Sequence, residues 1–108
     1  MASKRFEVDL RERLRDPEFA ATYLAAAMED DALTGSADGL LHAVREIAQS
    51  RGGGISGAAK EARIGRQTIY DGFKQGGNPQ IRTLNAVLHT FGLRLTVQTI
   101  PQAGQPQS

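Results

Sequence analysis

Polar side chains between residues 66 and 74 have the types and the spacing needed to contact DNA. Ile69 and Phe73 are four residues apart, so on a helix they share one face and leave the polar residues on the other side. A short helix with an apolar back and a front of Arg, Gln and Thr is what reading base edges in a major groove requires. The alternative is an ordinary solvated helix in a small helical domain. The outward positions are Arg66, Gln67, Thr68, Asp71 and Lys74.

Two flanking segments fit this interpretation. Before the helix, Ala58, Ala59, Ala62 and Ile64 offer small and apolar surfaces against which it can pack. After it, residues 76–79 (Gly-Gly-Asn-Pro) predict a sharp loop, because glycine supplies positive φ and Pro79 keeps the preceding residue out of the helical region. Amide groups of this loop could hold a DNA phosphate, although a plain helix–helix turn fits the same residues.

The net charge of +1 hides an uneven distribution. Residues 1–50 carry six Lys and Arg against ten Asp and Glu, a balance of −4, whereas residues 51–82 carry six against two, a balance of +4. A polyanion is therefore attracted to the middle of the chain and repelled by its first half.

The sequence contains no constellation that indicates catalysis. His42 and His89 each lie on the polar side of a predicted helix with no second ligand at metal-binding spacing, and there is no cysteine. We predict no enzyme, no metal site and no cofactor. The absence of cysteine, of an apolar signal-peptide region and of any apolar run of about 20 residues predicts a cytoplasmic protein without a membrane segment.

Helix signals recur along residues 16–91. Asp16 is a good N-cap and Pro17 a good first residue for a helix that extends to about Glu29, where the acidic residues oppose its dipole. The next helix is expected to begin at a Ser36 or Asp38 cap and to end near residue 50, and Ser56 is expected to cap the one after it. Core-facing stripes are predicted at two sets of positions: Leu40, Leu41, Val44, Ile47 and Ala48, and then Ile81, Leu84, Leu88 and Phe91 with Val87 at the edge.

The two ends are expected to differ from this helical domain of residues 16–100. Residues 1–15 form an N-terminal arm whose alternation at Phe6, Val8 and Leu10 suits an extended segment, although Leu10 and Leu14 also suit a helical turn. Residues 93–99 alternate in the manner of a β-strand. Its simplest partner is its copy in a second subunit, through Leu95, Thr96 and Val97, with the N-terminal arm or another protein as alternatives. Residues 101–108 are expected to be a disordered tail.

The chain resembles a known family over about four fifths of its length. Residues 56–95 look like the helix-turn-helix domain of the Xre/Cro repressor class, and the whole resembles the addiction-module antidote (HigA-like) antitoxins that partner RelE/HigB-like toxins. The segments that carry the resemblance are DPEFAATYLAAAMEDD at 16–31, LLHAVREIAQSRGG at 40–53, AAKEARIGRQTIYDGF at 58–73, GGNP at 76–79 and TLNAVLHTFGLRLTV at 83–97.

The resemblance implies a five-helix Xre/Cro-like helix-turn-helix domain that normally acts as a dimer. Together with the alternation of residues 93–99, this predicts a mainly α fold with one C-terminal β-strand, which a homodimer could pair. The resemblance also implies operator DNA as one partner and a small basic toxin that cleaves messenger RNA as another. Arg66, Gln67, Thr68, Tyr70 and Asp71 then become the DNA-facing positions. Two departures fall in the turn, where Arg63 replaces a usual glycine and Gly65 a usual serine cap. Either Arg63 takes a positive φ at an energetic cost, or the turn is rearranged.

Each DNA-facing residue has an expected contact. Arg66 prefers guanine and Gln67 adenine, while Thr68 suits a thymine methyl group or a phosphate. Asp71 either accepts from a cytosine amino group or pairs with Lys74. The expected phosphate contacts are Arg63, Tyr70, Lys74 and Asn78.

The toxin contacts are expected within residues 1–35, because of the acidic balance of the first half of the chain. Candidate residues are Phe6, Leu10, Glu29, Asp30 and Asp31. Two other functions remain open from the sequence. One is a stand-alone Xre/Cro-type transcriptional repressor without a toxin partner, and the other is a helical interaction module that has lost DNA binding.

Overall fold

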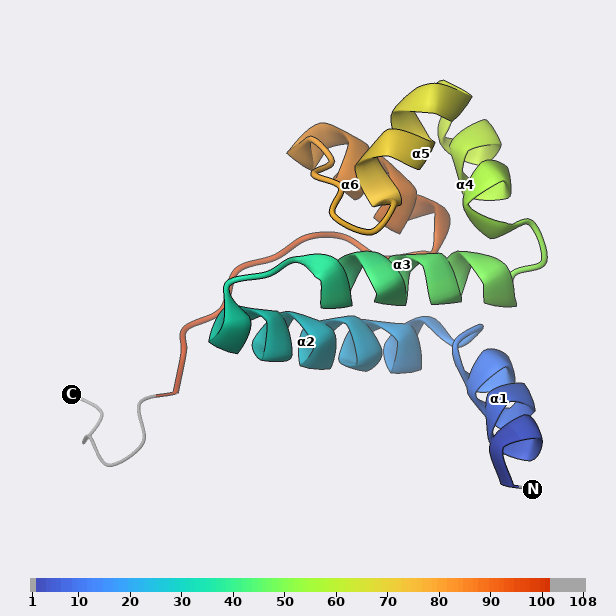
Figure 1. The fold of residues 1–108 in the computed structure, drawn as a ribbon, viewed down its shortest axis with the longest axis vertical. Helices are drawn as coiled ribbons and strands as arrows, with labels where there is room; N and C mark the ends of the chain where they lie inside the picture. The colour runs from blue at the N-terminus through green and yellow to red at the C-terminus, as the bar shows by residue number, and fades with distance from the viewer. Residues whose placement is uncertain (1, 102–108) are drawn as a thin grey trace.

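The computed structural model describes residues 2–101, with side chains from Val8 onward. This part of the chain forms six helices (Figure 1): α1 (Ala2–Arg13), α2 (Pro17–Thr34), α3 (Asp38–Ser50), α4 (Gly54–Ala62), α5 (Arg66–Phe73) and α6 (Ile81–Thr90). The prediction of a mainly α fold is confirmed. The five expected helices are present, and α1 is a sixth.

Helix α1 replaces the extended arm that the alternation of apolar residues suggested. Leu14, just after the helix, is buried and Leu10 is half-buried, so the four-residue spacing of these two leucines gives α1 its contact with the core. Arg11 and Arg13 lie in the last turn, where they complement the helix dipole. Arg15, two residues after the end of α1, donates from Nε to the carbonyl oxygen of Ser50 at 2.9 Å. The helical interpretation of Leu10 and Leu14 was therefore the correct one.

Helix α2 begins as predicted but is longer than expected. The Asp16 side chain accepts a hydrogen bond from the backbone N–H of Glu18 at 3.2 Å, and Pro17 is the first helical residue. The helix continues past Glu29 to Thr34 and ends at Gly35, whose φ of 75° is left-handed. The acidic residues therefore do not stop it.

The carboxylate of Asp31 in α2 caps the start of α3. Its Oδ1 accepts from the backbone N–H of Gly39 at 2.9 Å and its Oδ2 accepts from that of Leu40 at 2.8 Å. Ser36 also accepts, from the N–H of Asp38 at 2.9 Å, whereas Asp38 is itself the first residue of the helix. The strongest cap thus comes from another helix, where local sequence signals do not reveal it.

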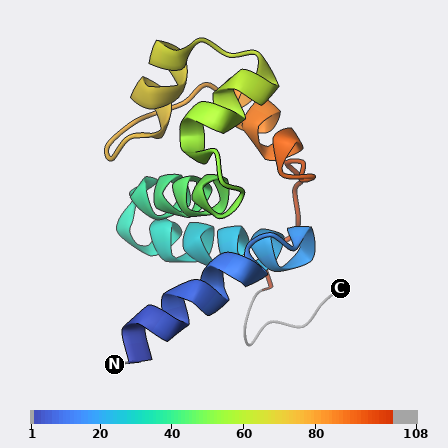
Figure 2. The ribbon, with the colours of Figure 1, turned by 90° about the vertical axis from the view of Figure 1, so that its right-hand side faces the viewer.

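Helix α3 lies at the centre of the fold, between α2 and the group formed by α4, α5 and α6 (Figures 1 and 2). The predicted stripe is confirmed, with Leu40 half-buried and the others buried. In α6 the stripe is rotated from the prediction, since Val87 is fully buried and Ile81 is 76% exposed. The reason is that Ile81 is the first residue of α6 and the core covers only the later turns. The buried core comprises Leu14, Ala20, Leu24, Leu41, Ala43, Val44, Ile47, Ala48, Ala58, Ala59, Ile69, Phe73, Val87, Leu88 and Phe91.

The predicted C-terminal strand is absent from the described residues. Gly92, after the end of α6, has a left-handed φ of 80°, and residues 93–101 have no regular secondary structure. A strand needs a neighbour for its backbone groups, and the described chain supplies none. Alternation of apolar and polar residues was thus not sufficient to predict a strand. The predicted tail lies outside the described residues except for Pro101.

Candidate nucleic-acid interface

Helices α4 and α5 form a pair joined by a three-residue turn, with α3 below them and α6 to one side (Figure 2). Helix α4 begins at Gly54, two residues before the expected Ser56 cap, and buries Ala58 and Ala59. Helix α5 buries Ile69 and Phe73, which are 0% and 1% exposed. The prediction that these two side chains form the apolar back of α5 is confirmed.

The turn between the two helices has the first of the two geometries considered for Arg63. This residue has φ 60° and ψ 43°, the left-handed conformation, and is the only non-glycine residue with positive φ within residues 2–101. The N–H of Ile64 donates to the carbonyl oxygen of Ala59 at 2.9 Å, which closes the end of α4. Gly65, with φ −59° and ψ 143°, is the N-cap of α5 and provides no side-chain hydrogen bond.

We expect the Arg63→Gly variant to be more stable than the native chain by about 0.5–1 kcal/mol. The left-handed conformation costs a residue with a Cβ about 1–2 kcal/mol, and glycine's greater backbone entropy offsets part of the gain. Arg63→Ala is the matched control, because it also removes the guanidinium but keeps the Cβ. Urea unfolding of the three proteins checks this prediction. Equal stability of the Gly and Ala variants would show that the turn stores no such strain.

The polar face of α5 is exposed, and part of it is held in place by contacts with neighbouring side chains. The guanidinium of Arg66 lies over the ring of Tyr70, 5.6 Å from its centroid, and the Tyr70 hydroxyl is 2.6 Å from the Ser56 hydroxyl on α4. The hydrogen bond with Ser56, together with the positive charge of Arg66, lowers the pKa of Tyr70. Ser56 was predicted only as a helix cap. In the structure its hydroxyl restricts the Tyr70 side chain, and the Tyr70 ring in turn lies against the Arg66 guanidinium.

Asp71 is paired with Gln67 rather than with Lys74. Gln67 donates from Nε2 to Oδ1 of Asp71 at 3.0 Å, one helical turn away. Because Gln67 is uncharged, this hydrogen bond does not neutralise the negative charge of Asp71. It does orient the Gln67 amide in the absence of a ligand. Of the two contacts considered for Asp71, the pair with Lys74 gives way in this structure to the Gln67–Asp71 hydrogen bond, and the contact with a cytosine amino group stays a prediction.

Two side chains of α3 hold the C-terminal end of α5 and the loop that follows. Arg45 donates from Nη1 to the carbonyl oxygen of Phe73 at 2.6 Å, and Asp38 accepts from the N–H of Gly76 at 2.9 Å. Gly77 is closely covered, since a Cβ there would lie 2.8 Å from the carbonyl oxygen of Asp71. These attachments join residues about 30 to 40 positions apart, so the spacing within α5 could not reveal them.

All eight predicted DNA-contact residues are exposed on this part of the molecule, in α5, the turn before it and the loop after it. Beside them is a shallow hollow of about 310 Å³ with largely apolar walls from α3, α4, α5 and the start of the loop after α5. Its lining residues are Arg45, Ile55, Ile69, Tyr70, Phe73, Lys74 and Gln75. Their roles in DNA binding stay predictions. These residues form one exposed surface with a cation near each end: Arg66, whose guanidinium lies over the Tyr70 ring, and Lys74.

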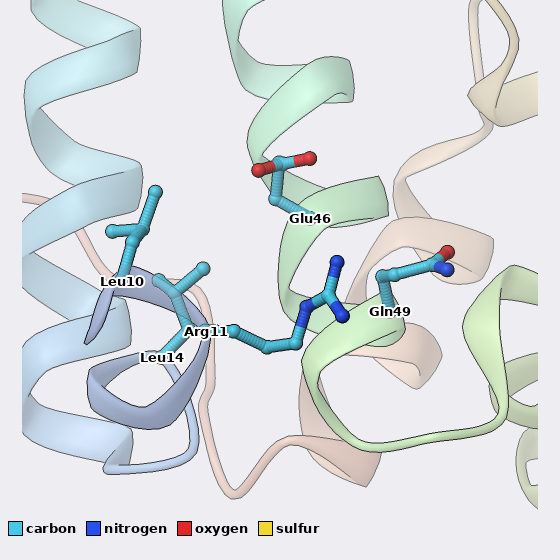
Figure 3. A pocket seen from close by; sticks show the side chains of 5 residues that line it. All are labelled: Leu10, Arg11, Leu14, Glu46 and Gln49. Atoms are coloured by element: carbon cyan, nitrogen blue, oxygen red, sulfur yellow. The ribbon is translucent and has the colours of Figure 1, made fainter. Parts of the chain in front are cut away.

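The five candidate toxin contacts have different surroundings. Glu29 and Asp30 are exposed on α2, whereas Asp31 is half-buried and occupied as the cap of α3. Leu10 lines a hollow of about 250 Å³ between α1 and α3, into which Arg11 extends toward Glu46 and Gln49 (Figure 3). The Phe6 side chain lies outside the described residues. Toxin binding by these residues stays a prediction.

The described residues contain neither a candidate metal site nor a helix that could span a membrane. No group of three or more His, Cys, Asp or Glu side chains is placed to hold a metal ion, and His42 and His89 are both exposed. None of the described helices combines the length and the apolar character that crossing a membrane requires.

Comparison with known families identifies the chain. Residues 4–99 match the family model described as "Probable addiction module antidote protein". Searches of curated proteins and of solved structures gave no significant match. Because the match covers nearly the whole sequence, the chain belongs to the addiction module antidote family, and this membership supports an antitoxin role with a cognate toxin as partner.

Proposed function

We propose that this antitoxin binds operator DNA through α4 and α5, acting as a helix-turn-helix of the Xre/Cro type, and thereby represses its own operon. We further propose that it neutralises a RelE/HigB-like toxin that cleaves messenger RNA. In this role the protein is not an enzyme. It works in the cytoplasm as a homodimer, without a metal or cofactor, and the exposed residues Leu95, Thr96 and Val97 stay its candidate dimer contacts.

The observation that carries the DNA proposal is the left-handed turn at Arg63 between two short helices. This turn lets α5 bury Ile69 and Phe73 while its other side stays exposed. A recognition helix needs this arrangement, because its base-contacting side chains must enter the major groove while the rest of the domain supports it from behind.

The contacts of α5 support a division of roles among its polar residues. Arg66, stacked on Tyr70, and Gln67, oriented by Asp71, have restricted side chains suited to base edges. Lys74 follows the last residue of α5 beside the loop and suits a phosphate, with Arg63 and Asn78. Thr68 remains available for a thymine methyl group or a phosphate.

The alternative of a stand-alone repressor without a toxin is weakened by the family match. The neighbouring gene provides a further check: a small basic reading frame of about 100 residues, as the sequence resemblance implies, supports the antitoxin proposal.

Replacing Arg66 with alanine is expected to weaken operator binding by about 1–3 kcal/mol and to relax specificity at one base pair. Replacing Lys74 with alanine is expected to weaken binding to all sequences alike and to reduce the slope of the salt dependence by about one. Gel-shift titrations on the DNA upstream of the protein's own gene, at several salt concentrations, measure both effects.

The control for base reading is a scrambled duplex of the same length and composition. Equal affinity of the native protein for the operator and the scrambled duplex contradicts specific recognition. Failure of both variants to alter binding contradicts the placement of the interface on α5. Arg13→Ala, an exposed change at the end of α1 that also removes one positive charge, serves as the matched control for altered net charge.

A further inference from the structure

Tyr70 lies on the exposed side of α5, and its hydroxyl already makes a hydrogen bond within the protein. The hydroxyl oxygens of Tyr70 and Ser56 are 2.6 Å apart, and Ser56 is the third residue of α4. Within the described residues this is the one side-chain hydrogen bond that joins α4 to α5. The two helices are therefore linked at a point away from the turn that connects them.

This hydrogen bond restricts the orientation of the Tyr70 ring. A tyrosine side chain rotates about two torsions, χ1 and χ2, and its hydroxyl is at the far end of the ring. Holding the hydroxyl therefore limits both torsions, although the side chain is 42% exposed. The Tyr70 ring is thus held from α4 at one end and from α5 at the other.

The Tyr70 ring in turn limits where the Arg66 guanidinium lies. The two residues are one turn apart on α5, and Cζ of Arg66 is 5.6 Å from the ring centroid. A guanidinium that lies over an aromatic face keeps the N–H donors around its edge available, and these donors pair with the two acceptors of guanine. The contact with the ring therefore restricts Arg66 without using the atoms that the proposed base contact needs.

Restricting Arg66 in the free protein favours binding to the operator in particular. An arginine side chain loses rotamer freedom when it is immobilised in an interface, and this loss weakens binding. A side chain that is already restricted loses less. Because phosphate contacts carry no sequence information, only the base contact of Arg66 gains from this restriction. The gain therefore appears as sequence discrimination and not as general affinity for DNA.

We propose that Ser56 and Tyr70 are positioning residues for operator recognition: Ser56 orients the Tyr70 ring, and the ring presents the Arg66 guanidinium to its base. This inference rests on the proposed operator binding through α5. It gives Tyr70 an indirect role in sequence discrimination in place of the phosphate contact expected from the sequence. It also gives Ser56, on the other helix of the pair, a role in specificity.

The test compares variants of the full chain by gel-shift titration on the operator and on the scrambled duplex. Ser56→Ala and Tyr70→Phe each remove one hydroxyl of the hydrogen-bonded pair and keep the aromatic ring and the guanidinium. We expect each variant to reduce the ratio of operator affinity to scrambled-duplex affinity by about three- to tenfold. The affinity for the scrambled duplex should stay within about twofold of the native value, with the same salt dependence, because no phosphate contact is lost.

Three further variants separate the hydrogen bond from other effects. Ser56→Ala/Tyr70→Phe is expected to lose no more than either single variant, since both changes remove the same interaction. Ser56→Thr keeps a hydroxyl and should retain the native ratio. Tyr23→Phe, which removes the other tyrosine hydroxyl of the chain, on α2, is the matched control. Urea unfolding checks each fold, and alanine at residue 56 favours the helix over serine, so unfolding cannot explain a lost ratio.

A measurement without DNA tests the contact between the two hydroxyls. The chain has two tyrosines, so Tyr23→Phe leaves Tyr70 as the only phenol that ionises. In the native chain the hydrogen bond with Ser56 and the positive charge of Arg66 lower the pKa of Tyr70. Adding Ser56→Ala to Tyr23→Phe is expected to raise the pKa of Tyr70, measured by the ultraviolet absorbance of the phenolate. An unchanged pKa would show that the two hydroxyls are not hydrogen-bonded in solution and would overturn the inference.

The DNA results distinguish this inference from the proposed function. If the native protein binds the operator and the scrambled duplex equally, operator recognition fails and this inference fails with it. If the native protein is specific and Ser56→Ala leaves the ratio of affinities unchanged, only the positioning role is wrong. If Tyr70→Phe weakens binding to both duplexes alike and Ser56→Ala does not, Tyr70 contacts a phosphate itself and the inference is overturned.

Discussion

Replacing Phe73 with alanine is expected to lower the free energy of unfolding by about 3–5 kcal/mol. Phe73 is one of the largest fully buried side chains, 1% exposed, and it is the last residue of α5. Its removal leaves a cavity at the contact between α5 and α3, beside the point where Arg45 binds its carbonyl oxygen. A domain of this size typically has about 5–15 kcal/mol of stability in total. Thermal and urea unfolding measure the loss.

Tyr70→Ala is the matched control for Phe73→Ala, because it removes an aromatic ring from the same helix on its exposed side. This change removes the contacts with Ser56 and Arg66 but leaves no cavity in the core, so we expect a loss of about 1 kcal/mol or less. Comparable destabilisation by both changes contradicts the assignment of the two sides of α5. Operator binding should fall in both variants, but for Phe73→Ala only in proportion to the unfolded fraction.

Replacing Asp31 with alanine is expected to destabilise the protein by about 2–3 kcal/mol. The change removes two hydrogen bonds to a charged acceptor and a negative charge at the N-terminus of α3. The N–H groups of Gly39 and Leu40 are left partly buried without this partner. Urea unfolding of the native and Asp31→Ala proteins gives the loss directly.

Gly39→Ala tests the same cap from its other side. A Cβ at residue 39 would lie 2.6 Å from Oδ1 of Asp31, so the carboxylate must move away from the amides that it caps. Alone, we expect this change to destabilise the protein by about 1–2 kcal/mol, but in the Asp31→Ala background it should be close to neutral, since alanine favours a helix over glycine. Strictly additive losses in the double variant contradict the proposed coupling.

Local signals in the sequence were sufficient to predict which side of α5 is buried and which is exposed. The four-residue spacing of Ile69 and Phe73 predicted its buried side. The Asp16 cap was predicted in the same way. For Arg63 the family pattern left a positive φ and a rearranged turn open, and the structure has the positive φ. Each of these features depends on residues within one or two turns of one another, and patterns of this length can be recognised directly.

The features that the sequence did not reveal depend on contacts between distant residues. The cap of α3 comes from Asp31 in α2, and the end of α5 is held by Arg45 in α3. At residues 93–99 the alternating pattern led to a wrong prediction, because strand formation also depends on a neighbouring strand. The sequence around α1 fitted both an extended segment and a helical turn. The structure has the helix, with Leu14 buried just after it.

The opposite sides of α5 also have a consequence for how such proteins diversify. Ile69 and Phe73 carry the structural constraint, whereas Arg66, Gln67 and Thr68 are exposed and contribute little to packing. Most exposed substitutions change stability by no more than about 0.5 kcal/mol, so mutations can accumulate on the outward side without unfolding the domain. If α5 reads operator DNA as proposed, a duplicated copy of this gene could acquire a new operator preference through a few outward substitutions while its buried residues stay unchanged.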